Sequence, residues 1–253
     1  MSNGIVFYRG PSEIDGVDIL GVASGIVNPS RNPKTGPMIQ TWILLDGIAP
    51  HIATKSGADF SICGNCRHRG TIETLKGSTR NVGRSCYVTT FQAPRNVWTQ
   101  CRDGKYATVS LAETAAIFAG RKVRLGAYGD PAAIPFDVWA EVMAGVEAGQ
   151  STGYTHQWQD CDSRFSQYCM ASVDTALEAE LASAKGYRYF RVTHRGEVKR
   201  AGEVVCPASD EMGKKTDCAS CRACGGFASK ARAHITIAAH STGAMAFEKR
   251  EVA

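Results

Sequence analysis

Short apolar runs alternate with turns along most of the chain, and their patterns predict strands and helices in alternating order. Runs of apolar and β-branched residues predict strands at Ile19–Val27, Ile39–Leu45, Lys122–Tyr128, Thr152–Trp158, Tyr168–Val173, Tyr187–Thr193, Glu203–Cys206 and His234–His240. Apolar residues at helical spacing predict helices at Pro94–Arg102, Leu111–Ala119, Phe136–Val146 and Asp174–Lys185, the last with Asp174 as its N-cap.

Turn-forming residues divide this pattern into segments of one α/β domain, residues 1–253. Residues 1–37 are rich in Gly, Pro, Ser and Asn, which predicts a turn-rich segment. Residues 38–205 carry the strand–helix repeats and a first cysteine-containing loop at 62–87, in which the stretch between Cys66 and Cys86 has the composition of a loop. A cysteine-rich loop follows at 206–226, and the last strand and tail occupy 227–253.

Alternating strands and helices with short connections predict parallel strands linked by crossover helices. Six to seven such strands favour a partial TIM-like (β/α) barrel with the cysteine-rich loops at the strand carboxyl ends. A doubly wound open sheet is the alternative.

Polar residues follow several of the predicted strands, where parallel α/β folds place their chemistry. Asp130 follows the strand ending at Tyr128, and His156 and His194 lie in or just after later strands. Each of the three could instead have a structural role: Asp130 in a turn, and the two histidines as hydrogen-bonded residues of the core or its rim. Their shared edge makes them our candidates for catalytic residues.

Composition narrows the class of protein further. Hydrophobic residues make up 43% of the chain, enough for a packed core, and the net charge of +5 is too small to argue for nucleic acid by itself. The first residues have no apolar signal segment, and no run approaches the length of a membrane span, so we expect a cytoplasmic protein that does not enter the membrane. In that compartment the ten cysteines are expected as ligands or buried thiols rather than disulfides.

The stretch from Cys206 to Gly226 carries the most specific chemical signal. Cys218, Cys221 and Cys224 follow one another at two-residue spacing, with Cys206 as a remote fourth thiol. That arrangement is typical of a 4Fe–4S cluster. Zinc held by the same four thiols is the alternative.

A second group consists of Cys63, Cys66 and Cys86. Three thiols without a clear fourth would leave a coordination position open on a cluster, as a reactive site requires. His68 could instead complete a zinc site, or thiols of both groups could share one ion. Cys101, Cys161 and Cys169 stand alone and are expected as buried small hydrophobes.

The order of motifs resembles uncharacterised phage and prophage proteins with a radical-SAM-like barrel. The resemblance rests on the thiol loop ending in Cys86–Tyr87 and on three stretches: GAYGDPAAIPFDVWAEVM at 126–143, YTHQW at 154–158 and the run from Ser172 to Val192. The superfamily's cysteine spacing is C-x3-C-x2-C, whereas here nineteen residues separate Cys66 from Cys86.

The resemblance implies a catalytic 4Fe–4S cluster at Cys63, Cys66 and Cys86, with S-adenosylmethionine (SAM) at its open iron. It places Ser172 and Asp174 near the ribose of SAM, and Gly129 and Asp130 near its amino-acid end. The second thiol group would resemble an auxiliary cluster. The substrate, a small molecule or a macromolecule, is not named by any motif.

A binding module is the competing hypothesis. Zinc at one or both thiol groups would hold loops of an α/β scaffold, and a nucleic-acid or protein partner would bind without catalysis. The basic residues near the thiols could face a phosphate-bearing or nucleic-acid partner, or instead balance thiolate charge or simply be solvated: Arg67, Arg69, Arg80, Arg84, Lys214, Lys215, Arg222, Lys230 and Arg232.

Overall fold

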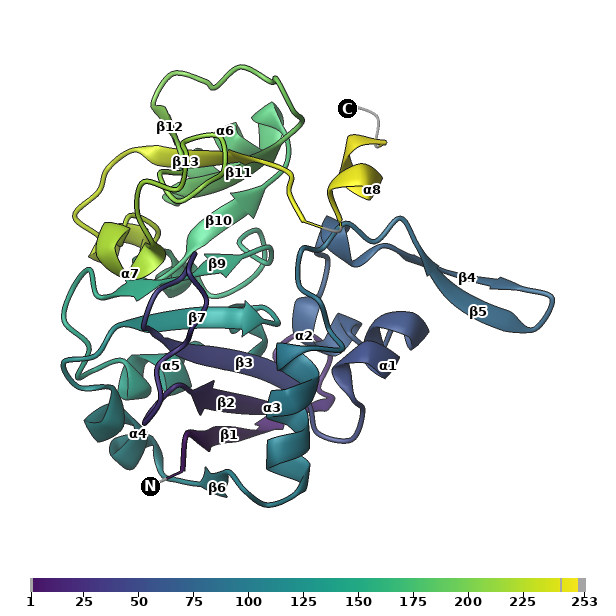
Figure 1. The fold of residues 1–253 in the computed structure, drawn as a ribbon, viewed down its shortest axis with the longest axis vertical. Helices are drawn as coiled ribbons and strands as arrows, with labels where there is room; N and C mark the ends of the chain where they lie inside the picture. Colours follow the sequence, from purple (N-terminus) through teal and green to yellow (C-terminus); the bar gives the residue numbers. More distant parts are fainter. Residues whose placement is uncertain (1, 242, 250–253) are drawn as a thin grey trace.

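The computed structural model describes residues 2–241 and 243–249, which form a mixed α/β fold with three sheets. The first sheet has six strands (Figure 1). Their order across the sheet is β6 (Ala107–Thr108), β1 (Gly4–Pro11), β2 (Asp18–Ser24), β3 (Ile39–Leu45), β7 (Val123–Tyr128) and β8 (Ser151–Thr152). Strands β1, β2 and β3 pair antiparallel, whereas β3, β7 and β8 pair parallel.

The second sheet has five strands, all parallel. Their order is β12 (Glu203–Val205), β13 (His234–Ala238), β11 (Tyr189–Thr193), β10 (Met170–Val173) and β9 (Tyr154–Thr155). Only Gly153 separates β8, at the edge of the first sheet, from β9, at the edge of the second. The chain thus passes from one sheet directly into the other (Figure 1).

Eight α-helices are assigned in the described residues: α1 (Pro50–Ser56), α2 (Phe60–Cys63), α3 (Ala93–Arg102), α4 (Leu111–Phe118), α5 (Phe136–Val142), α6 (Ala176–Ala184), α7 (Cys218–Cys221) and α8 (Ala244–Glu248). Single turns of 3-10 helix lie at η1 (Arg67–Arg69), η2 (Pro131–Ala133), η3 (Ser163–Gln167) and η4 (Gly226–Ala228). None of the helices in this part of the chain combines the length and the apolar character that crossing a bilayer requires.

Apolar side chains of the first sheet form the largest core cluster. Every residue of β3 is buried, which explains why its apolar run was predicted with the observed bounds. Trp139 of α5 is fully buried against Phe7 of β1, and its indole N–H donates to the Pro131 carbonyl at 2.9 Å. This contact joins the helix after β7 to the antiparallel end of the sheet.

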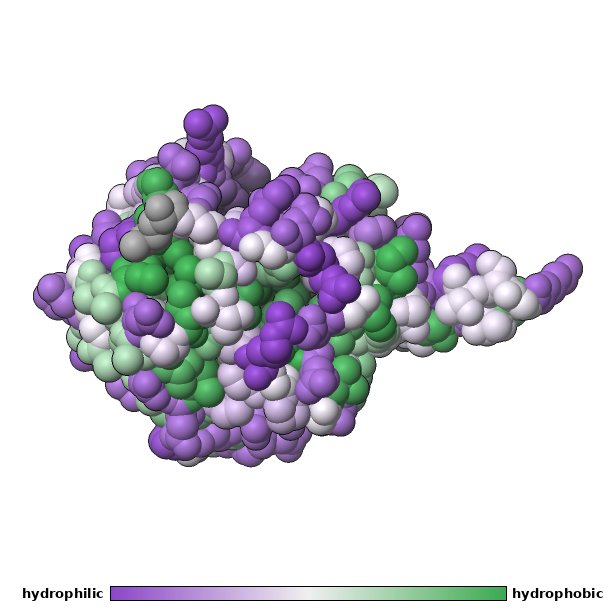
Figure 2. Space-filling view, turned by 90° about the horizontal axis from the view of Figure 1, so that it is seen from below, coloured by the Kyte–Doolittle hydropathy of each residue, from purple (hydrophilic) through white to green (hydrophobic). Residues whose placement is uncertain are grey.

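The stretch between Cys66 and Cys86 is a hairpin, not the predicted loop. Strands β4 (Thr71–Leu75) and β5 (Ser78–Val82) pair antiparallel and extend from the body as an arm with a hydrophilic tip (Figures 1 and 2). Lys76 and Gly77 at the turn have φ of 50° and 77°, as a two-residue hairpin turn with two left-handed positions requires. Most of the strand residues are exposed, so no buried face marks the strands in the sequence.

Four other predictions need correction. Residues 1–37 contain β1 as well as β2, and the strands β1 to β3 are antiparallel rather than linked by crossovers. The strand predicted at 152–158 is interrupted at Gly153 and ends at Thr155. Thr175, not Asp174, caps α6: its hydroxyl accepts from the Glu178 N–H at 3.1 Å, and Glu178 completes a capping box.

A buried ion pair lies in the second sheet, between β11 and β12. Arg191 donates to both carboxylate oxygens of Glu203, at 2.7 and 2.9 Å, and both side chains are essentially buried. Burial raises the pKa of Glu203, but the hydrogen bonds from Arg191 and from the Arg200 N–H outweigh it and hold the pKa below its usual value. The pair therefore stabilises the fold in the ionised form of Glu203.

Glu203→Gln is expected to lower the free energy of unfolding by about 3 kcal/mol at neutral pH, because the buried Arg191 would keep only the partly exposed Glu197 as a counter-charge. Since the folded-state pKa is depressed, the difference from wild type is full above the unfolded pKa of about 4.3 and shrinks as the pH falls through the folded value. Urea unfolding of both proteins at pH 7 and pH 3.5 measures this difference in the free energy of unfolding. Glu180→Gln, at an exposed pair with Arg200, is the control and should change stability by less than about 1 kcal/mol. Equal losses in both variants would contradict the assignment.

Candidate functional site

Both groups of cysteines open onto one cavity at the carboxyl ends of the parallel strands. The cavity has a volume of about 470 Å³ and is lined by Cys63, Cys66 and Cys86 as well as by Cys206 and Cys218. Cys221 and Cys224 do not line it, but both lie close to the other two thiols: Cys221 contributes to raising the pKa values of Cys206 and Cys218, and these two contribute to raising the pKa of Cys224. We call this space the inner cavity.

The first thiol group is held against the ends of β7 and β9. Cys63 ends α2, and its carbonyl accepts from the Gln157 side chain at 3.0 Å. The Ile62 carbonyl accepts from the Asp130 N–H at 2.6 Å. Gly64 has a φ of 51°, and a Cβ there would lie 2.3 Å from Gln157 Oε1, so the loop approaches β9 closely because residue 64 is glycine.

Arg69 fixes the other side of this loop. It donates from Nε and Nη2 to Asp59 Oδ1, at 3.1 and 2.7 Å, and to the carbonyls of Gly64 and Gly57. Asp59 is fully buried, and its Oδ2 lies 3.8 Å from Arg84 Nη1. One buried carboxylate thus organises two arginines around the loop that carries Cys63 and Cys66.

The second thiol group lies in one loop that three distant segments hold in place. Cys206 follows β12 and donates its N–H to the Thr236 carbonyl of β13 at 2.8 Å. The Cys224 carbonyl accepts from the Gly153 N–H between β8 and β9 at 2.9 Å. Cys218 begins α7 and donates its N–H to the carbonyl of Lys34, in the turn-rich N-terminal segment, at 2.9 Å.

Burial raises the pKa of Cys63, Cys66 and Cys86 in the first group and of Cys206, Cys218 and Cys224 in the second. It is the largest cause for Cys63 and for Cys66, whose pKa rises to about 12, and the charges of neighbouring thiols and carboxylates add to it at Cys63. In the second group burial likewise raises the pKa of Cys224 to about 12. These thiols are therefore neutral at pH 7 without a metal, and a bound metal would displace their protons.

The thiols are gathered but do not surround a common point. Across residues 2–241 and 243–249, no set of three or more Cys, His, Asp or Glu side chains has an arrangement that could hold a metal ion as it stands. All ten cysteines are free thiols. The donor chemistry of each group suits iron or zinc, and the assignment of the seven cysteines as ligands stays a prediction.

The polar residues predicted from the strand ends separate into two sets. Gly129, Asp130, His156 and Ser172 line the inner cavity. Asp130 is also structural: its Oδ1 accepts from the Ala132 N–H, which starts η2, and its Oδ2 accepts from the His156 N–H at 2.7 Å. His156 Nε2 is buried and has no hydrogen-bond partner among the described residues.

Asp174 and His194 are not among the residues lining the inner cavity, but both reach its wall through a neighbour. Asp174 Oδ1 lies 3.0 Å from His68 Nε2, and His68 Nδ1 lies 2.9 Å from the Ser85 hydroxyl. His194 lies 3.1 Å from a Glu248 oxygen and packs against Phe247, with ring centroids 4.8 Å apart. Asp174 thus positions a cavity histidine, whereas His194 pairs with the C-terminal helix α8.

Several side chains that line the inner cavity carry no sequence motif. Tyr128 is buried, and its hydroxyl has no hydrogen-bond partner among the described residues. Burial and the nearby Cys63 raise its pKa well above the usual value. Arg124 and Lys34 also line the cavity. Arg124 interrupts an otherwise apolar strand, a signal that sequence reasoning could have used, whereas nothing marks Lys34.

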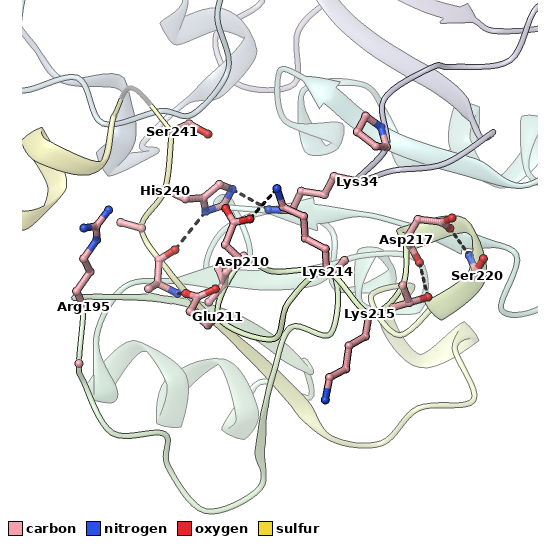
Figure 3. Close-up of a pocket in the computed structure, with 17 residues that line it drawn as sticks. Lys34, Arg195, Asp210, Glu211, Lys214, Lys215, Asp217, Ser220, His240 and Ser241 are labelled. Carbon is pink, nitrogen blue, oxygen red and sulfur yellow. Dashed lines mark hydrogen bonds and ion pairs between the residues drawn. The ribbon is translucent and has the colours of Figure 1, made fainter.

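An outer cavity of about 930 Å³ adjoins the inner one. The two share five lining residues, all near the carboxyl end of β13 or the turn-rich segment: Lys34, Ile237, Ala239, His240 and Ser241. Figure 3 shows Lys34 and His240 meeting across the outer cavity, with Nζ and Nε2 2.8 Å apart. Lys214 pairs there with Asp210 at 2.8 Å.

The basic residues near the thiols are partly occupied within the protein. Arg69 and Arg84 face Asp59, Arg80 pairs with Glu73, and Arg232 donates to the Ser229 carbonyl. They therefore provide less free positive surface than their number in the sequence suggests. Of the isolated cysteines, Cys169 is fully buried as predicted, whereas Cys101 and Cys161 are partly exposed.

Comparisons of the chain with protein-family models, with curated proteins and with solved structures gave no match.

Proposed function

We propose that the protein is an iron–sulfur enzyme of the radical-SAM type acting on a substrate held in the inner cavity. The observation that supports this most is that both thiol groups, 120 or more residues apart in sequence, face one cavity at the ends of parallel strands. A structural zinc site is usually closed and has no need of a ligand-sized space beside it.

We further propose that the two sheets form one partial (β/α) barrel. The parallel run β3, β7, β8 and the parallel run β9, β10, β11, β13, β12 are continuous in the chain through Gly153. In such a barrel the strand carboxyl ends carry the chemistry, which agrees with the cavity lining of Asp130, His156 and Ser172.

Two 4Fe–4S clusters are the proposed cofactors, and zinc is the alternative. Cys63, Cys66 and Cys86 would hold the first, whose open iron would bind SAM and supply an electron to it. Cys206, Cys218, Cys221 and Cys224 would hold the second as a closed auxiliary centre. Gly129, Asp130 and Ser172 are placed on the cavity wall, where they would contact SAM.

The chain's own residues have definite tasks in this proposal. Asp130 holds the backbone of His156 in the cavity wall, and the buried His156 Nε2 has no partner among the described residues. Ser85 and Asp174 hold both ring nitrogens of His68, which lines the cavity between the first thiol group and β10. Tyr128 adds a hydroxyl that has no partner among the described residues. These groups would orient a polar ligand next to the first thiol group.

Protein loaded with iron and sulfide without oxygen is expected to bind SAM in equilibrium dialysis and to consume it when dithionite is supplied. Cys101→Ser, outside both thiol groups, should behave as wild type. A loaded protein that neither binds nor consumes SAM would remove the SAM part of the proposal. Binding by the metal-free protein alone would show that the thiols are not involved.

A further inference from the structure

Two basic side chains face the inner cavity without a carboxylate partner. Lys34 and Arg124 both line this cavity, and among the described residues neither forms an ion pair with Asp or Glu. Other arginines in the interior are held by a carboxylate, as Arg69 is by Asp59, or by backbone carbonyls, as Arg188 is by those of Ala223, Gly226 and Ala233. Lys34 and Arg124 are half-buried and have neither kind of partner among the described residues, so an anion in the cavity would supply the missing counter-charge.

Lys34 is held in place by the second thiol group. Its carbonyl accepts from the Cys218 N–H at 2.9 Å, and the Thr35 carbonyl accepts from the Ala219 N–H at 3.0 Å. The next residue, Gly36, has a φ of 69°, and a Cβ there would lie 2.8 Å from Asp217 Oδ1. The backbone of Lys34 is therefore fixed by hydrogen bonds to α7, a segment distant in sequence, and does not lie on a free surface loop.

The ammonium group of Lys34 uses only one of its N–H groups in its hydrogen bond with His240. Its Nζ lies 2.8 Å from His240 Nε2, and His240 Nδ1 lies 3.2 Å from the Ala238 carbonyl, which assigns the proton of the ring to Nδ1. Burial and then the charge of Lys34 lower the pKa of His240, so the imidazole is neutral and accepts from Lys34. Two of the three ammonium hydrogens remain for another acceptor.

Arg124 approaches from β7 on the same wall. Its Nη2 donates to the Tyr87 hydroxyl at 2.7 Å, while its Nε is buried and has no partner among the described residues. Tyr87 stacks on His240 with ring centroids 5.9 Å apart, so Lys34, His240, Tyr87 and Arg124 form a continuous series. Burial lowers the pKa of Lys34, and the charge of Arg124 adds to this.

We propose that Lys34 and Arg124 bind the carboxylate or phosphate group of a small-molecule substrate in the inner cavity, beside Cys218. The catalytic relevance of this anion site rests on the proposed function, for which it specifies an anionic substrate. A guanidinium with a free N–H and an adjacent ammonium suit a planar or tetrahedral oxyanion. The outer cavity, which shares Lys34 and His240 with the inner one, is the route by which the anion reaches them.

Titration calorimetry at low salt with inorganic phosphate and with succinate tests the proposal and separates the two anion classes. Wild type is expected to bind at least one of them. Lys34→Gln and Arg124→Gln should each weaken that binding by about tenfold or more, the value of one lost charge-assisted hydrogen bond. Arg124→Lys keeps the positive charge but loses the paired N–H groups of the guanidinium. Its anion affinity should lie between those of wild type and Arg124→Gln.

Lys215→Gln is the control, because Lys215 lines the outer cavity alone. It should retain the affinity of wild type. Failure of wild type to bind either anion, or equal weakening in the control, would overturn the proposal. So would variants that lose iron while their anion affinity is unchanged, since Lys34 and Arg124 would then serve to offset metal-bound thiolates. Anion binding by a protein without iron would leave this site standing and remove the proposed function instead.

Discussion

We expect Cys63→Ser to lose about four irons per chain and to stop consuming SAM, because in the proposed function its thiol belongs to the group that leaves a coordination position open for SAM. Cys206→Ser should also lose about four irons, from the second group, while SAM still binds at the first. SAM binding is expected to be kept in Cys206→Ser and lost in Cys63→Ser. Measuring iron content and SAM dialysis on the same samples therefore distinguishes two separate metal centres from a single shared one.

The control for this pair is Cys161→Ser, which makes the same thiol-to-hydroxyl change at a partly buried residue outside both groups. Its iron content should match that of wild type. Loss of all iron in either ligand variant would instead indicate a single centre that thiols of both groups share. Unchanged iron in both would remove these cysteines from the ligand set.

Asp59→Ala is expected to lower the free energy of unfolding by about 3–5 kcal/mol, the usual cost of removing one partner of a buried ion pair. Arg69 and Arg84 would lose their shared carboxylate, and Arg69 also supports the Gly57 and Gly64 carbonyls of the thiol loop. The first thiol group should therefore lose its iron, while the second keeps it. Urea unfolding and iron analysis measure the two effects.

Asp103→Ala removes an exposed carboxylate that pairs with Lys105 at 3.0 Å, and it is the matched control. Its stability should change by less than about 1 kcal/mol. If Asp59→Ala kept both its stability and its iron, the buried carboxylate would not organise the loop, and the position of Cys63 would have to depend on the contacts with Gln157 and Asp130.

Where burial imposes a pattern, the sequence is a good guide to this fold. The apolar run of β3 has the predicted bounds, and β7, β10, β11 and β13 lie within theirs, because buried strands must be apolar. The hairpin β4–β5 has no buried face, and only its Lys76–Gly77 turn could have indicated it. β1 was missed although Ile5–Tyr8 is an apolar run, because the glycines and prolines around it indicate turns; it pairs with β2 across a short turn, whereas its pairing with β6 depends on residues about 100 positions away.

Some parts of the candidate site could be predicted from the sequence and others could not. Spacing alone indicates the thiols, since metal ligands recur at short intervals in a chain. That both groups face one cavity depends on the order of strands in two sheets, which spacing does not encode. Lys34 reaches the cavity only because its carbonyl and that of Thr35 bind the start of α7, a contact between residues more than 180 positions apart. Arg124 was open to prediction as a charge within an apolar strand.

The central claim is that the thiols hold iron–sulfur clusters beside a substrate cavity, and metal analysis tests it most directly. The protein should be made and purified without oxygen and assayed for iron, zinc and acid-labile sulfide per chain. The proposal predicts a brown protein with about eight irons and a similar amount of sulfide. A colourless protein with stoichiometric zinc and no labile sulfide, even after reconstitution, would contradict it.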